Sequence, residues 1–447
     1  MSLQTYHLEP PCGLMNDPNG LSFYHGRYRV FFQWNRFAKD HTHKEWGAFS
    51  SADLAHWSFD GSAIVPDQPY DHSGVHSGCA IEMDGELLLY YTGSDKSCGV
   101  RRSHQCLVST TDCHTYLKEG VIIETPEGFT GHVRDPKVIT TSKGLYCMLL
   151  GAQRTNGKAA LIAFDSSDGR SWRFAGTFAA SEAVEMCECP DLVSLPEGRM
   201  LLWCPQRRDN ERDLGLESYA CYREVTEGEL ASGTLSLDSG IQTEPGSDFY
   251  APQTFVAPDA RTILIAWMDR LDDEQGRALA AASHVSGCLT VPRELSLRAG
   301  RLCQVPVSEL VSLERTRYAL VTCGDGSLAC HPDTRAFRIR IRKVPDCTLL
   351  HVELNGGSET LSFDTRTDIL TLSRTDWMSG KRQEVSRNVG RLRNLDLLSD
   401  STSLELFAND GEAVITMRVL PQTKDASVRI TGVTDPDLFE VVEMGQR

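Results

Sequence analysis

Asp17-Pro18-Asn19-Gly20-Leu21 opens a segment whose plan recurs four more times in the first 270 residues. Each segment has a short opening, a turn and then a strongly apolar run, such as Leu87 to Tyr91. The openings start at residues 17, 77, 135, 189 and 251, so that neighbours lie 54 to 62 residues apart. The turns, which carry the residues typical of β-hairpins, are marked by Gly26, Gly85, Gly144, Gly198 and Pro258-Asp259.

This period leaves room for two further strands in each segment. Five four-stranded units in a ring form a five-bladed β-propeller. A long β-sandwich and a parallel β-helix are the alternatives, but β-helix repeats are much shorter and a sandwich does not need the same opening five times. We therefore predict an all-β fold, with a five-bladed β-propeller over residues 1–300.

The openings themselves point to a site. Four of the five carry proline at the second position, and proline is expected at the first residues of a strand or on an edge strand. If the openings begin the innermost strands, they converge on one mouth of the central channel. Three residues at or beside them are acidic, namely Asp17, Asp135 and Glu188.

The plan changes after about residue 300. Residues 337–342 alternate between apolar and basic side chains, which is typical of an antiparallel strand with one exposed face. Asn409-Asp410-Gly411 lies between two apolar runs and predicts a hairpin turn. We predict a second all-β domain over residues 301–447, most simply a β-sandwich, and little helix anywhere.

Hydrolysis of a glycosidic bond usually needs two carboxyl groups, one to protonate the departing oxygen and one to attack or to activate water. The acid needs a pKa raised by burial or by neighbouring anions, which crowded carboxylates supply. Each residue also has a purely structural interpretation. Asp17 can make an Asx-turn, Asp135 can pair with Arg134 at the surface, and Glu188 can be a solvent-facing strand residue. Their shared place in the repeat favours a joint function.

The segments around these carboxylates resemble the three signature motifs of the invertase-like glycoside hydrolases, family 32, and in particular the bacterial intracellular type. The segments are Met15-Asn16-Asp17-Pro18-Asn19-Gly20, Arg134-Asp135-Pro136 and Glu188-Cys189-Pro190. Further similar blocks cover nearly the whole chain, at residues 31–35, 51–57, 248–253, 289–295 and 407–412. The resemblance implies a propeller followed by a sandwich, in agreement with the repeat.

The resemblance also implies roles in a retaining β-fructofuranosidase. Asp17 would be the nucleophile, Glu188 the acid/base and Asp135 the stabiliser of the transition state. The substrates would be sucrose and short fructo-oligosaccharides, cut at the terminal non-reducing β-fructofuranosyl residue, with no metal and no organic cofactor. The residues that match substrate-binding positions are Asn16, Gln33, Trp46, His76, Ser77, Arg134 and Tyr250.

Three other functions remain open at this point. Fructosyl transfer uses the same intermediate with a sugar in place of water. Sucrose-6-phosphate hydrolysis needs basic residues near the glucose 6-position, for which the candidates are His41, His43, Lys44, Arg101 and Arg102. A non-catalytic sugar-binding propeller predicts the loss of a carboxylate, and all three are present.

Composition limits the partners and the compartment. The net charge of −16 argues against nucleic acid and anionic membranes, and mildly against an anionic substrate. A small sugar is the expected partner, with a homodimer built on the second domain left open. The chain shows no transmembrane stretch, no signal sequence in Met1 to His7, and 15 cysteines without a CxxC pair. These features predict a cytoplasmic protein.

Overall fold

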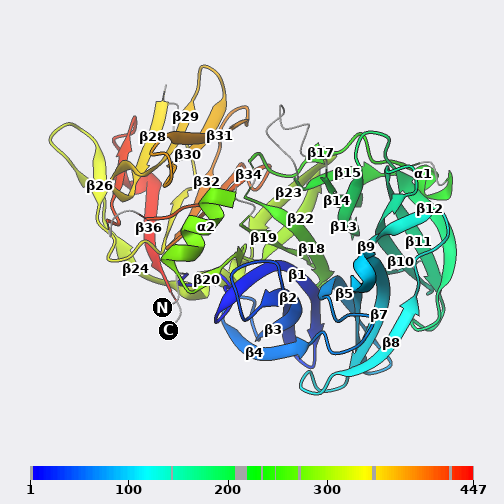
Figure 1. The fold of residues 1–447 in the computed structure, drawn as a ribbon. Coiled ribbons are helices and arrows are strands. Elements are labelled where there is room, and N and C mark those ends of the chain that lie inside the picture. Colours follow the sequence, from blue (N-terminus) through cyan, green and yellow to red (C-terminus); the bar gives the residue numbers. More distant parts are fainter. Residues whose placement is uncertain are drawn as a thin grey trace. The chain divides into compact units, whose positions relative to one another are not determined.

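We describe the protein from a computed structural model. The structure describes residues 4–141, 144–206, 219–232, 235–246, 248–269, 273–344, 349–421 and 425–445. In these ranges the only α-helices are the short α1 (Glu227–Ser232) and α2 (Asp273–Ala282). The prediction of an all-β chain with little helix is confirmed (Figure 1). Within the same ranges, no helix is long and apolar enough to cross a membrane.

The chain forms two compact units. The repeat-containing unit consists of Cys12–Thr243 and Phe249–Trp267. The C-terminal unit consists of Met1–Pro11, Glu244–Asp248 and Met268–Arg447. The predicted domain boundary at residue 300 stays a prediction, because the two units are defined by packing and each contains separate stretches of the chain.

Antiparallel sheets with neighbouring strands in chain order make up the repeat-containing unit. The first contains β1 (Gly13–Tyr24), β2 (Arg27–Asn35), β3 (Glu45–Ser51) and β4 (Trp57–Ile64). The second contains β5 (Val75–Met83), β6 (Glu86–Asp95), β7 (Arg102–Thr110) and β8 (Leu117–Ile123). The third contains β9 (Phe129–Thr140), β10 (Tyr146–Arg154), β11 (Ala159–Ser166) and β12 (Arg173–Ala180), with the short β16 (Leu235–Ser236) at its edge. The fourth contains β13 (Met186–Leu195), β14 (Gly198–Gln206), β15 (Cys221–Val225) and β17 (Ile241–Gln242). The last opening leads into a hairpin of β18 (Tyr250–Val256) and β19 (Thr262–Met268).

The first strands of the five repeats meet in a closed circle. β1 contacts β5, β5 contacts β9, β9 contacts β13, β13 contacts β18, and β18 contacts β1. The middle of each second strand is a run of apolar residues, as expected for a strand with both faces covered. On β6, Leu87, Leu89 and Tyr91 pack against the first sheet, whereas Leu88 and Tyr90 pack against the third. Residues about 60 apart in the sequence are thereby brought side by side.

A β-bulge interrupts each first strand at the same level. The residues that have no partner in the pairing are Asn16–Asp17, His76–Ser77, Asp135–Pro136, Cys189–Pro190 and Ala251–Pro252. Pro136, Pro190 and Pro252 therefore lie inside their strands and not at the first residues, but these strands (β9, β13 and β18) are at the edge of their sheets, as expected for proline. A bulge tolerates proline because the residue there donates no ladder hydrogen bond. The left-handed backbone of Asp135, Cys189 and Ala251 (φ 62°, 48° and 49°) bends the strand at this level.

Two sheets that share one core make up most of the C-terminal unit. One runs in the order β24 (Glu314–Tyr318), β36 (Phe439–Met444), β27 (Phe337–Ile341), β32 (Leu395–Asp400), β33 (Ser403–Ala408), β34 (Ala413–Arg418). The other runs in the order β25 (Val321–Thr322), β26 (Leu328–Cys330), β35 (Val428–Thr431), β28 (Leu349–Leu354), β29 (Glu359–Asp364), β30 (Ile369–Thr375), β31 (Arg382–Asn388). The remaining strands are β20 (Val285–Ser286), β21 (Cys288–Leu289), β22 (Arg293–Arg298) and β23 (Arg301–Pro306). The predicted hairpin at Asn409-Asp410-Gly411 joins β33 to β34.

Candidate active site

Asp17 lies in the bulge of β1 and is held by three side chains. The Ser77 hydroxyl donates to its Oδ2 at 2.6 Å, and the Gln33 amide donates to the same oxygen at 3.0 Å. The Asn16 amide donates to Oδ1 at 3.2 Å. Gln33 also donates to the Ser77 hydroxyl. The carboxylate is thus fixed by neutral donors, which favour its charged form and leave it available to attack an electrophilic carbon.

Glu188 lies at the edge of the bulge in β13, and both of its oxygens have partners. Arg134 donates to Oε1 from Nη2 at 2.8 Å and from Nε at 3.0 Å. Oε2 receives the Gln206 amide and the Tyr250 hydroxyl, each at 2.6 Å. The side chain of Glu188 is 18% exposed, so the carboxyl group is fixed but not sealed from a ligand.

Asp135 lies in the bulge of β9, the strand that contacts the one carrying Glu188. Its Oδ2 accepts the Cys189 backbone N–H at 3.0 Å and lies 4.0 Å from Nε of Arg134. Its own backbone N–H donates to the Thr92 hydroxyl at 3.0 Å. The bulge thus connects Asp135 to the segment that carries Glu188.

Neighbouring carboxyl groups affect the pKa of both Asp17 and Asp135. Burial raises the pKa of Asp17, and the negative charge of Glu188 adds to the effect, although the Ser77 hydrogen bond acts in the opposite direction. Burial and the charges of Glu188 and Asp17 raise the pKa of Asp135 to about 7, against the lowering effect of Arg134. Such shifts are typical of sites that perform acid–base chemistry.

The other predicted residues differ in how they meet this cluster. Asn16, Gln33 and Ser77 surround Asp17, whereas Arg134 and Tyr250 surround Glu188. Trp46 is fully buried and donates its indole N–H to the backbone carbonyl of His76 at 3.0 Å, so it supports the strand that carries Ser77. The Nε2 atom of His76 is buried and has no hydrogen-bond partner among the described residues. Burial, followed by the charge of Lys44, lowers the pKa of His76 to about 3, so this ring is neutral.

Two polar residues at the site were not predicted. Gln206 ends the apolar run of β14 and donates to Glu188, as Gln33 in the apolar strand β2 donates to Asp17, and a glutamine in an otherwise apolar strand was a usable signal in the sequence. Nδ1 of His132 accepts a hydrogen bond from Nη1 of Arg134 at 3.2 Å, two residues along β9, and this contact has no recognisable signal in the sequence.

Five basic residues were candidates for binding a substrate phosphate, and two of them, Lys44 and Arg101, lie near the three carboxyl groups. Nζ of Lys44 donates to Oδ1 of Asn16 and lies 2.7 Å from Nδ1 of His41, and burial lowers its pKa to about 7. The pKa of the half-buried Arg101 is lowered by burial and by the charge of Arg134, and the charge of Glu188 only partly offsets this lowering. His43 pairs instead with Glu45 at 2.9 Å, and Arg102 is exposed on β7 opposite Asp95. The charges that act on His76 are those of Lys44, Arg134, Arg101 and Lys96, so cations gather around the carboxylates of a strongly acidic chain.

The arrangement can transfer a glycosyl group. It offers a fixed carboxylate, a second carboxyl group in a hydrogen-bonded setting and a third with a raised pKa. Within the described ranges, no group of three or more His, Cys, Asp and Glu side chains is placed to hold a metal ion.

Comparison with known proteins agrees with this chemistry. Residues 7–306 match the family described as Glycosyl hydrolases family 32 N-terminal domain, and residues 326–438 match Glycosyl hydrolases family 32 C terminal. A sucrose-6-phosphate hydrolase of Klebsiella pneumoniae is 37% identical over 93% of this chain and 88% of its own length. A raffinose invertase of Escherichia coli is 33% identical over 93% and 89%. The solved structure of sucrose-6-phosphate hydrolase from Lactobacillus gasseri has a TM-score of 0.84 at 26% identity and covers 99% of this chain and 93% of that one.

The two family matches together cover most of the chain, and the first of them contains all three predicted motifs. Relatives above 30% identity align with almost the whole length of the chain. The protein is therefore a glycoside hydrolase, and it belongs to glycoside hydrolase family 32.

Proposed function

We propose that the chain is a retaining β-fructofuranosidase with Asp17 as nucleophile and Glu188 as acid/base. Asp17 attacks the anomeric carbon of the fructosyl unit while Glu188 protonates the leaving-group oxygen, and water activated by Glu188 then releases fructose. Asp135 stabilises the positive charge that develops at the sugar ring. The observation that carries the proposal is the hydrogen-bonded setting of both carboxyl groups, with neutral donors on Asp17 and an arginine on Glu188.

We further propose sucrose 6-phosphate as the preferred substrate, which reverses the order of our prediction. The net charge of −16 disfavours an anionic ligand at long range, but a ligand in the pocket experiences the local field. That field comes from Lys44, Lys96, Arg101 and Arg134. The names of the Klebsiella and Lactobacillus relatives point the same way. Sucrose itself is the second candidate, because the similar Escherichia coli protein is named an invertase.

The architecture also remains a proposal in its details. The closed circle of β1, β5, β9, β13 and β18 supports a five-bladed propeller over residues 1–300, and the two sheets on one core support a sandwich over residues 301–447. The cytoplasmic location and the homodimer stay predictions.

The first test is release of fructose from sucrose, sucrose 6-phosphate, 1-kestose, inulin, levan and raffinose, with Asp17→Ala beside the native chain. We expect release from one or more of the first three substrates, and none with the variant. A folded native chain that releases no fructose from any of them would contradict the fructosidase proposal.

The second test separates the phosphorylated substrate from sucrose. We expect Arg101→Gln to lower the ratio of kcat/KM for sucrose 6-phosphate to kcat/KM for sucrose about tenfold or more, as expected from the loss of one charge-assisted hydrogen bond of about 1.5–3 kcal/mol. Arg102→Gln is the matched control, because it removes the same charge from the exposed neighbouring position. A native ratio of one or less would leave sucrose as the better substrate proposal, and equal ratios in the native chain and both variants would remove Arg101 from phosphate recognition.

A further inference from the structure

Lys44 is a buried cation that contacts no carboxylate. It directly precedes β3 and is 5% exposed. Its Nζ atom donates to Oδ1 of Asn16 and lies 2.7 Å from Nδ1 of His41. Its side chain makes no further hydrogen bond and no ion pair to the residues that the structure describes. Burial of an ammonium group without a counter-ion in contact costs free energy, so Lys44 is a candidate for a functional role.

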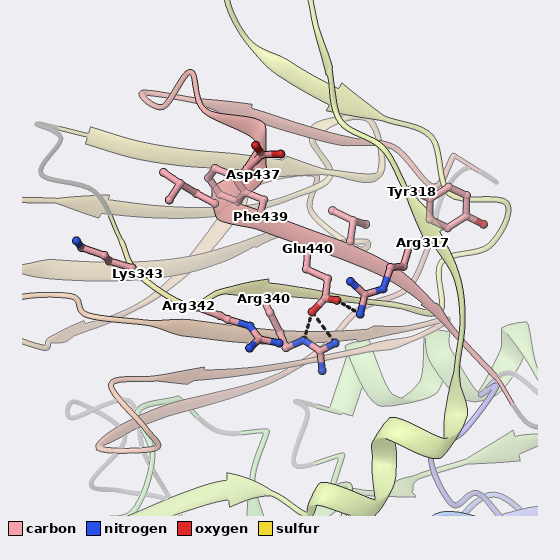
Figure 2. A pocket seen from close by; sticks show the side chains of 10 residues that line it. Arg317, Tyr318, Arg340, Arg342, Lys343, Asp437, Phe439 and Glu440 are labelled. Atoms are coloured by element: carbon pink, nitrogen blue, oxygen red, sulfur yellow. Dashed lines mark hydrogen bonds and ion pairs between the residues drawn. The ribbon is translucent and has the colours of Figure 1, made fainter.

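Cations elsewhere in the chain have the carboxylate that Lys44 lacks. Arg340 in the C-terminal unit is held by Glu440 at 2.6 Å (Figure 2). Lys118 on β8 pairs with Asp71, whose side chain is fully buried. In both cases an opposite charge in contact offsets the loss of hydration. Lys44 departs from this arrangement.

The carboxylates that act on Lys44 do so without touching it. Burial lowers the pKa of Lys44 to about 7, against the raising effects of Asp17 and then Asp40. Burial raises the pKa of Asp17 in turn, and the charge of Lys44 counteracts this rise. Burial, followed by the charge of Lys44, also lowers the pKa of His76. Of the two carboxylates, Asp17 has the stronger interaction with Lys44.

Asn16 links Lys44 to Asp17. Its Nδ2 atom donates to Oδ1 of Asp17 at 3.2 Å, and its Oδ1 atom accepts from Lys44. An amide turned by half a rotation would present its oxygen to the carboxylate and its N–H groups to the ammonium group, which is unfavourable on both sides. Lys44 thereby fixes the orientation in which Asn16 donates to Asp17. An amine donates to Asn16 as well as an ammonium group does, so this contact persists above the pKa of Lys44.

His41 holds Lys44 from a second side. It lies in the segment between β2 and β3, where the Asn35 amide donates to the backbone carbonyl of the preceding Asp40 at 2.9 Å. The ring of His41 is nearly perpendicular to that of Trp267, with 6.3 Å between the ring centroids. The ammonium group is therefore placed by the protein itself, between His41 and Asn16.

Lys44 and Arg101 act on different carboxyl groups of the site. The charge of Asp17 acts on Lys44, whereas those of Arg134 and Glu188 act on Arg101. In the proposed reaction Asp17 attacks the fructosyl unit, and Glu188 protonates the leaving group that carries the phosphate. Lys44 therefore belongs to the fructosyl side of the reaction, away from the phosphate.

We propose that Lys44 is a positioning residue for the nucleophile: it holds the Asn16 amide on Asp17, keeps a positive charge beside this pair and does not bind the substrate phosphate. This role rests on the proposed function, because it serves the attack by Asp17. Two variants separate its parts. Lys44→Met removes both the donor and the charge but keeps an unbranched side chain of similar length, whereas Lys44→Gln removes the charge and keeps a donor.

The experiment measures kcat and KM of the full chain for sucrose and sucrose 6-phosphate. We expect Lys44→Met to lower kcat about 10- to 100-fold for both substrates, as for the loss of one charge-assisted hydrogen bond. The ratio of the two kcat/KM values should change by less than about threefold. Lys118→Met, the matched control in the same unit, should keep kcat within about twofold of the native value. Full activity of Lys44→Met, or a ratio that falls about tenfold, would overturn the proposal.

A double variant tests whether Lys44 acts through Asn16. If it does, Asn16→Ala/Lys44→Met should have a kcat within about threefold of Asn16→Ala alone at the pH of maximal activity. Two losses that multiply in the double variant would contradict positioning through Asn16.

The pH profile separates the charge of Lys44 from its hydrogen bond. Both Lys44→Met and Lys44→Gln remove the charge, so the pKa of Asp17 should rise and the acidic limb of kcat/KM should move to higher pH. Lys44→Gln keeps a donor and should retain the higher kcat of the two. An acidic limb that stays in place in both variants would overturn the proposed effect of the charge.

Thermal unfolding tests for a purely structural role. Lys44→Met removes a buried charge that contacts no counter-ion, so its melting temperature should equal or exceed that of the native chain. Lys118→Met deprives Asp71 of its cation and should melt at a lower temperature. Loss of activity in Lys44→Met together with an equal loss of stability would overturn the proposal. A native chain that releases no fructose would contradict the proposed function, whereas equal activity of the native chain and Lys44→Met would contradict this inference alone.

Discussion

The phenol hydroxyl of Tyr250 lies 2.6 Å from Oε2 of Glu188, 62 residues away in the sequence. Gln206 donates to the same oxygen, and Arg134 occupies Oε1. Only the Tyr250 hydroxyl can both donate and accept through the atom that contacts Glu188, because Arg134 only donates and the Gln206 carboxamide accepts through its other atom, Oε1, which takes a hydrogen bond from Nη2 of Arg134 at 3.4 Å. In the proposed mechanism Glu188 alternates between its protonated and charged forms. The Tyr250 hydroxyl can donate to the charged form of Glu188 and accept from its protonated form, so neither form leaves an unpaired donor.

We therefore expect Tyr250→Phe to lower kcat about 10- to 100-fold, within the range of effects of single groups in acid–base catalysis, with a smaller change in KM. Steady-state kinetics over pH 4–9 with the best substrate of the fructose-release assay tests this. Tyr90→Phe is the control, because it removes a buried hydroxyl that bonds the Gly169 carbonyl. If KM rises while kcat is retained, Tyr250 contacts the substrate and not the proton carrier.

Ser77 provides the shortest of the contacts that hold Asp17. Its hydrogen bond lowers the pKa of Asp17 against the raising effect of burial. Ser77→Ala should therefore raise the pKa of Asp17 and move the acidic limb of the kcat/KM profile to higher pH, with a loss in rate of about tenfold at pH 5. Ser109→Ala, at a buried position on β7, is the control. An unchanged acidic limb would show that Gln33 and Asn16 hold the charged form without Ser77.

The repeated strands of the first unit were predictable, because the same opening, turn and apolar run recur five times in the sequence. Leu87 to Tyr91 is apolar at every position, which predicts a strand covered on both faces, and the openings placed Asp17, Asp135 and Glu188 together. The bulges were not predictable, because two residues become unpaired only when a specific partner strand is in register. Proline at positions 136, 190 and 252 was the signal, and it was interpreted as marking the first residues of a strand or an edge strand, of which only the edge strand is observed. Gln206 was missed for a similar reason, since its contact with Glu188 depends on pairing within the hairpin.

Asp135 should influence activity and stability in opposite directions. Its pKa is raised to about 7, above the ordinary value of 3.8, so the folded chain takes up a proton that the unfolded chain lacks between these values. The charged form consequently destabilises the native state, and this cost grows as pH rises through about 7. We expect Asp135→Asn to lower kcat by about 10²- to 10³-fold, because charge stabilisation of the transition state is lost. The same variant should melt at a higher temperature than the native chain at pH 8, and the difference should shrink at pH 5.

Differential scanning calorimetry at both pH values, beside activity assays, tests the Asp135 prediction. Asp165→Asn, at a side chain that is 44% exposed on β11, controls for the loss of one negative charge. An equal gain in melting temperature at pH 5 and pH 8 would contradict the role of the raised pKa. Full activity in Asp135→Asn would remove this residue from the proposed mechanism.

His7 gives the C-terminal unit a pH dependence of the same sign as that of Asp135, since both groups have a folded pKa above the ordinary value, but in His7 the charged form is the stabilising one. Its ring is fully buried between Asp400, at 2.9 Å from Nδ1, and Glu405, at 2.7 Å from Nε2. Burial lowers the pKa of His7, but the hydrogen bonds to both carboxylates outweigh it and raise the pKa to about 9. Because the folded value lies above the ordinary 6.5, the stabilisation is complete below pH 6.5 and is lost as pH rises through about 9. The shift corresponds to about 3 kcal/mol.

We expect His7→Gln to lower the urea midpoint of the full chain strongly at pH 6, and by much less at pH 10. The exposed His114→Gln should change the midpoint at neither pH. A difference between native chain and His7→Gln that stays constant from pH 6 to pH 10 would show that His7 acts through packing and not through its charge.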